Sequence, residues 1–188
     1  MLVRSSVVVL VGTFSVGAAE AQPVRYSLVG TGTGHLDGVQ FFDTAFEIVL
    51  SGDLNQIGVS PGGNPQILDI GATIAIDGIS SGSTFLPQMS LVSNLNTNRL
   101  IFGNQNSNSA LAIMDNDAFV GYELGADFGP VSDDSIDAVH NFSGQLTSDG
   151  LLGFGVISTM TFTATLVPTP ASAMLFGAAG LCAARRRR

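Results

Sequence analysis

The sequence predicts an all-β fold, in the form of a single antiparallel β-sandwich or jelly-roll-like domain. Apolar residues alternate with polar residues over short runs, and turn-forming pairs such as Asp77-Gly78 separate the runs. No convincing amphipathic helix pattern occurs between the two ends of the chain. The length of 188 residues suits one such domain, to which we assign residues 22–166.

The predicted strands follow one another with short connections, as expected for an antiparallel sheet. They cover residues 24–29, 45–50, 68–77, 85–92, 99–102, 110–114, 118–124 and 156–166. The clearest early strand places these residues on one face: Leu68, Ile70, Ala72, Ile74 and Ile76. The last strand has an apolar side with Ser158 as its one polar break, made of Val156, Met160, Phe162, Ala164 and Leu166. Its other side is rich in threonine and suits a solvated sheet surface.

The glycine-rich stretch of residues 30–38 is predicted to be a loop or a flat edge hairpin. It is a poor candidate for a nucleotide-binding loop, because such loops present their N–H groups at the start of a helix and no helical pattern follows here. Residues 58–65 and the acidic residues 125–137 are also predicted to be loops.

The first 21 residues have the pattern of a secretory signal peptide. Arg4 supplies the positive charge, and residues 7–16 form an apolar stretch. Ala19-Glu20-Ala21 is a small-x-small cleavage site, which would leave Gln22 as the first residue of the mature protein.

The C-terminal segment, residues 167–188, forms a separate module. It starts with Val167-Pro168-Thr169-Pro170, whose prolines interrupt any preceding strand or helix. The apolar run of residues 171–184 is predicted to be a membrane helix, although its 14 residues are fewer than the roughly 20 that span a bilayer. The four arginines Arg185, Arg186, Arg187 and Arg188 would remain on the cytoplasmic side, and their long side chains can extend the span.

This module resembles the PEP-CTERM sorting signal of bacteria, which combines a Val-Pro-Glu-Pro-like motif, a hydrophobic helix and an arginine-rich end. Val167, Pro168 and Pro170 match the motif, whereas Thr169 stands where the family usually has Glu. The resemblance covers residues 167–188 and implies processing by an exosortase-like membrane enzyme after passage through the export machinery. It implies nothing about the domain in front, although residues 30–46 are loosely similar to other ectodomains of this group.

Composition excludes several function classes. Residues 22–167 contain 14 acidic residues and two arginines, Arg25 and Arg99, which gives a formal charge of −12. Such a domain repels nucleic acids and anionic membranes. The only cysteine, Cys182, lies in the apolar C-terminal run, so neither an intramolecular disulfide nor a cysteine metal site can form.

Acidic turns are candidates for a Ca²⁺ site, because this ion prefers carboxylate oxygens. The best candidate cluster consists of Asp133, Asp134 and Asp137, and a second acidic turn is residues 115–117. Neither has the spacing of an EF-hand loop. The alternative is that these turns are solvated, so the sequence predicts no cofactor beyond this Ca²⁺ candidate.

The chain is not expected to be an enzyme. A hydrolase would need His35 or His140 as a general base beside a nucleophile, for which Ser143 and Asp137 are near His140 in sequence only. No nucleophile-elbow motif occurs, and the absence of tryptophan disfavours a sugar-cleaving site. The expected function is a structural or adhesive role in extracellular polymer, at the cell surface or in the matrix. The alternative is a carbohydrate- or Ca²⁺-dependent binding module, with extracellular polysaccharide as the partner.

Overall fold

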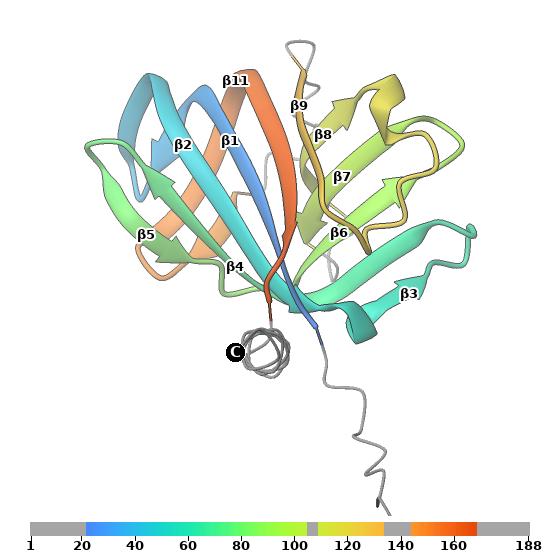
Figure 1. The fold of residues 1–188 in the computed structure, drawn as a ribbon. Coiled ribbons are helices and arrows are strands. Elements are labelled where there is room, and N and C mark those ends of the chain that lie inside the picture. Colours follow the sequence, from blue (N-terminus) through green and yellow to red (C-terminus); the bar gives the residue numbers. More distant parts are fainter. Residues whose placement is uncertain (1–21, 105–108, 134–143, 169–188) are drawn as a thin grey trace, which may run out of the picture.

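The computed structural model describes residues 22–104, 109–133 and 144–168, and they form one antiparallel sheet (Figure 1). The strands are β1 (Pro23–Leu36), β2 (Val39–Asp53), β3 (Ile57–Val59), β4 (Pro65–Ile76), β5 (Ser80–Thr84), β6 (Met89–Asn94), β7 (Arg99–Asn104), β8 (Ser109–Asp115), β9 (Phe128–Asp133), β10 (Gln145–Thr147) and β11 (Gly150–Leu166). Two short 3₁₀ turns, η1 (Leu54–Gln56) and η2 (Asp117–Phe119), complete the elements of this part of the chain. The predicted all-β class is confirmed, and its strands belong to one continuous sheet.

The sheet order is β10-β11-β1-β2-β4-β6-β7-β8, with β3 and β5 paired to β4 and β9 paired to β11. Strands β1, β2 and β11 are the longest, and β1 lies between the other two along almost its whole length. Even-numbered residues of β1 such as Tyr26 and Leu28 are buried, while odd-numbered residues such as Arg25 and Val29 face outward. This alternation is the one that the sequence predicts for residues 24–29.

The sheet bends at β4, which belongs to both of its halves. Residues 71–76 of β4 pair with β2, whereas residues 65–70 pair with β3 and β6. A register irregularity between Ile67 and Ile70 accompanies this change of partners. It also explains one wrong assignment, because Ile67 and not Leu68 continues the buried side of Ile70 and Ile74.

The other end of the sheet is connected back to β5. Phe85 forms a β-bridge with Thr147, and two further backbone bonds join Leu86 N to Leu146 O and Ser148 N to Thr84 O. The path through β10, β11, β1, β2, β4 and β5 therefore returns to β10. This half of the sheet closes on itself, while β6, β7 and β8 extend from the bend at β4 (Figure 1).

The apolar side chains of both halves meet in one core cluster. One aromatic group in it surrounds Phe162 and includes Tyr26, Phe119, Tyr122 and Phe128. Tyr26 is fully buried, and its hydroxyl donates a hydrogen bond of 2.9 Å to the Leu124 carbonyl. Burial raises the pKa of Tyr26 above its ordinary range, so this hydroxyl stays protonated and is a structural donor.

Three stretches differ most from their predicted structure. In addition, the predicted strand 85–92 begins only at Met89, apart from the isolated bridge at Phe85, and the predicted loop 58–65 overlaps β3. The glycine-rich residues 30–36 are not a loop or an edge, because they belong to the central strand β1. The hairpin does turn at Asp37-Gly38, where both residues have positive φ. The predicted strand 118–124 is instead η2 followed by turns, and part of the predicted loop 125–137 is strand β9.

The predicted buried and exposed faces of β11 are correct for only part of the strand, because the strand contains a β-bulge. Thr31 pairs with Thr159 but Gly32 pairs with Ile157, so Ser158 is an extra residue in a β-bulge. The bulge exchanges the two faces of the strand, which buries Ile157 and leaves Val156 58% exposed. Beyond it the predicted alternation holds, with Met160, Phe162 and Ala164 buried and the threonines facing outward.

Candidate functional site

Asp133 is the described member of the predicted Ca²⁺ cluster, and it lies beside the second acidic turn, residues 115–117. The carboxylates of Asp133, Asp115 and Asp117 all accept hydrogen bonds from protein donors. Asp133 is 8% exposed, and its carboxylate accepts a hydrogen bond of 2.8 Å from the backbone N–H of Asp115. The Asp115 carboxylate lies 2.6 Å from Arg99 Nε, and Asn98 Nδ2 donates to Asp117 at 2.9 Å. These contacts join β7, β8 and β9 and indicate a structural role for this acidic group.

The predicted Ca²⁺ cluster is described only in part. Asp134 and Asp137 lie outside the described residues, as do His140 and Ser143 of the hydrolase alternative. Within residues 22–104, 109–133 and 144–168, no three acidic, histidine or cysteine residues come together as a metal site. His35 is exposed on β1, and its ring lies over the backbone of Gly153 on β11.

We expect Asp133→Ala to lower the free energy of unfolding by about 1–3 kcal/mol, because the partly buried N–H of Asp115 would lose its acceptor. Urea denaturation followed by circular dichroism measures this change. Glu123→Ala is the control, since Glu123 is exposed and should change stability by less than about 0.5 kcal/mol. Equal stability of the two variants would show that the Asp133–Asp115 contact contributes nothing.

The face of the sheet opposite the core carries hydroxyl groups in register across several strands. The pairing of β1 with β11 places Ser27 opposite Thr163 and Thr31 opposite Thr159. Thr31 Oγ1 and Thr159 Oγ1 lie 3.1 Å apart, and Ser132 Oγ of β9 lies 2.8 Å from Thr161 Oγ1. The sequence indicated that the threonines of β11 face solvent, but not which hydroxyls neighbour them.

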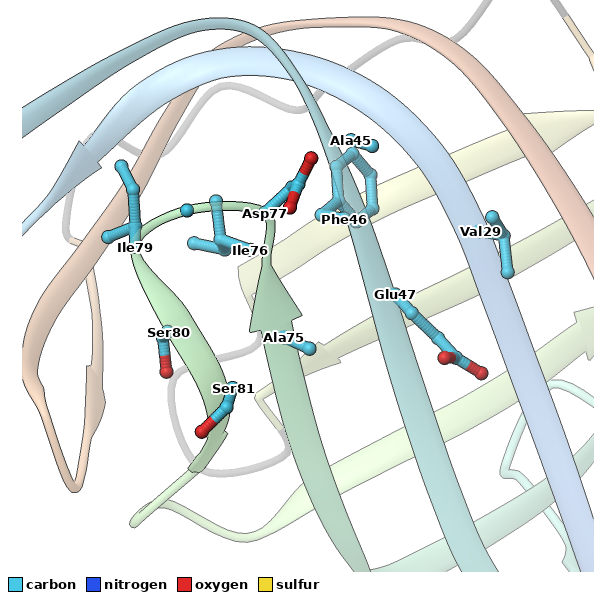
Figure 2. Close-up of a pocket in the computed structure, with 11 residues that line it drawn as sticks. Val29, Ala45, Phe46, Glu47, Ala75, Ile76, Asp77, Ile79, Ser80 and Ser81 are labelled. Carbon is cyan, nitrogen blue, oxygen red and sulfur yellow. The ribbon is translucent and has the colours of Figure 1, made fainter.

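Two open hollows lie on this outward face. The first has a volume of about 610 Å³ and is lined by β1, β2, β4 and the β4–β5 turn, with Val29, Glu47 and Ala75 among its residues (Figure 2). The second has a volume of about 480 Å³ and lies where β11 ends. Its lining residues are Arg25, Ser27, Thr163, Thr165, Leu166, Val167 and Pro168.

The two hollows adjoin through one small polar contact. Ser27 Oγ, in the second hollow, donates a hydrogen bond of 3.0 Å to Glu47 Oε1, in the first. Arg25 Nη2 lies 3.5 Å from the same oxygen. We refer to the two hollows together as the outer groove.

The described chain ends lie side by side at one end of the outer groove. Val24 pairs with Leu166, and the backbone N–H of Val167 donates to the Pro23 carbonyl at 2.9 Å. Strand β1 begins one residue after the predicted new N-terminus, Gln22, and β11 ends one residue before the predicted motif at Val167. The remaining predicted signal residues, Ala19, Ala21, Thr169, Pro170 and Arg185 to Arg188, lie outside the described residues, together with the predicted helix 171–184.

Comparison with protein-family models, curated proteins and solved structures finds no match to this chain. In the part of the chain that the structure describes, no helix has the length and apolar character needed to cross a membrane.

Proposed function

We propose that this chain is an exported, non-catalytic protein of the cell envelope or extracellular matrix, where it has a structural or adhesive role. Its N-terminal 21 residues direct export. The segment 167–188 anchors it transiently in the membrane until an exosortase-like enzyme recognises Val167 to Pro170. We class the domain as sandwich-like, because side chains from both halves of the bent sheet share one core.

The observation that supports this proposal is the position of the predicted cleavage point before Gln22 and of the predicted recognition motif, which starts at Val167. Gln22 and Val167 flank the first and last residues of the sheet, and the β1–β11 pairing holds them together. Cleavage before Gln22 or after Val167 would leave every described strand intact. Gln22 and Val167 also lie at the same end of the sheet, where β1 begins and β11 ends (Figure 1).

The test is the intact mass of the protein isolated from its own host, measured separately for envelope and medium. We expect a species that starts at Gln22 and ends near residues 168–171. Replacing Pro168 and Pro170 by alanine should cause the uncleaved C-terminus to accumulate in the membrane fraction. The exposed loop variant Pro61→Ala is the matched control and should be processed normally.

Two outcomes would contradict the proposal. A full-length soluble protein that still starts at Met1 would exclude export. A membrane species that keeps Arg188 in the unmodified protein would mean that the C-terminal segment is a permanent anchor and not a processed signal.

A further inference from the structure

We propose that the outer groove binds a single chain of an uncharged polysaccharide, which lies across β1 between the two hollows. This inference rests on the proposed function and names the polymer chemistry that the domain would contact. The two hollows, of about 610 Å³ and 480 Å³, adjoin through the Ser27–Glu47 contact. A groove of this form suits an extended, chain-like ligand better than a compact one.

The charge of the groove indicates an uncharged ligand. Residues 22–167 carry a formal charge of −12, and yet the charged residues that line the two hollows are Arg25, Glu47 and Asp77. Asp77 lies at the β4–β5 turn, at the far end of the first hollow, and the other two lie where the hollows adjoin. Arg25 Nη2 and Glu47 Oε1 lie 3.5 Å apart, and the two side chains neutralise each other. A polyanion would be repelled by the rest of the domain, and a polycation would find a single further carboxylate, Asp77, at one end of this groove.

The hydrogen-bonding groups of the groove indicate a polyhydroxylated ligand. Its floor is the face of a sheet whose backbone N–H and C=O groups pair with neighbouring strands, so an extended peptide could not bind it by strand addition. The groove presents side-chain hydroxyls instead, at Ser27, Thr163 and Thr165. A hydroxyl both donates and accepts, which matches the hydroxyls of a sugar.

Apolar surface lies beside these hydroxyls. Val29 is 48% exposed, and with Ala45 and Ala75 it forms an apolar side of the first hollow. Figure 2 shows Val29 and Ala75 on either side of Glu47. Sugar rings carry C–H faces as well as hydroxyls, so they can contact both kinds of surface at once.

Affinity electrophoresis tests the proposal, with the full chain in detergent and the neutral and acidic fractions of the host's extracellular polysaccharide in separate gels. We expect retardation by the neutral fraction only. The double variant Thr163→Val, Thr165→Val removes two hydroxyls but keeps β-branched shapes, and it should weaken retardation about tenfold. Ala75→Gln, which fills part of the first hollow, should weaken it independently.

Thr97→Val is the matched control, because Thr97 is exposed in the β6–β7 turn away from the groove; it should bind as the unmodified chain does. The proposal is overturned if the neutral fraction does not retard the chain, if only the acidic fraction does, or if both groove variants bind normally. If intact mass shows correct processing while one of these binding results is obtained, the polysaccharide-binding proposal is refuted and the proposed function still stands.

Discussion

Replacing Phe162 by alanine is expected to lower the free energy of unfolding by about 3–5 kcal/mol, a large share of the roughly 5–15 kcal/mol that stabilises a typical domain. Phe162 is fully buried on β11, and four aromatic rings surround it. The ring centroids of Phe119 and Tyr122 lie 5.8 Å and 5.9 Å from its own. Truncation would leave a large cavity where β11 packs against residues 119–128, because these rings come from different elements and cannot all move inward.

Urea denaturation followed by near-ultraviolet circular dichroism would measure the effect. Phe42→Ala is the matched control, since Phe42 is 69% exposed at the hairpin end of β2. The control should change stability by less than about 1 kcal/mol. If both variants lost the same stability, the cluster around Phe162 would not be a main source of folding energy.

Gly34→Ala should be the next most damaging change, with an expected loss of about 3 kcal/mol. A Cβ atom at Gly34 would lie 2.8 Å from Phe41 Cζ and closer still to the Gly153 carbonyl. The rings of Phe41, Phe46 and Phe154 pack together over the glycines of β1, with centroids 5.6 Å and 4.8 Å apart for the two pairs that include Phe154. The strand is held between two neighbours, so the backbone has little freedom to retreat.

Gly71→Ala is the matched control for this prediction. Gly71 also lies inside a strand, but a Cβ there would approach nothing closer than the Ser51 carbonyl at 4.0 Å. This variant should be neutral or stabilising by up to about 1 kcal/mol, because alanine has less freedom to lose on folding. Thermal unfolding of both variants compares them, and a stable Gly34→Ala protein would mean that both Phe41 and the Gly153 carbonyl can move aside without cost.

The sequence predicted the class of the fold because strand patterns are local. Alternation of apolar and polar residues identified most of β4 and the second half of β11, and the polar turn at Asp77-Gly78 was recognised from its residues alone. The outward threonines of β11 followed from the same pattern. Short elements such as β3, β5 and β10 were missed, because three to five residues carry too little periodicity to distinguish them from loops.

Only the tertiary structure decided which strands pair, in which register, and which surface features result from that pairing. The glycines of residues 30–34 looked like a loop, and they form a strand because aromatic rings from β2 and β11 cover them. The bulge at Ser158 exchanged the faces of β11, and a local pattern cannot show it because the extra residue is defined by the partner strand. The outer groove also results from strand pairing, because its lining residues come mainly from β1, β2, β4 and β11. By itself the sequence predicted an acidic β domain and led to the expectation that it is exported. Only the register of the strands placed Ser27 beside Glu47 and Thr163, which are distant in the chain.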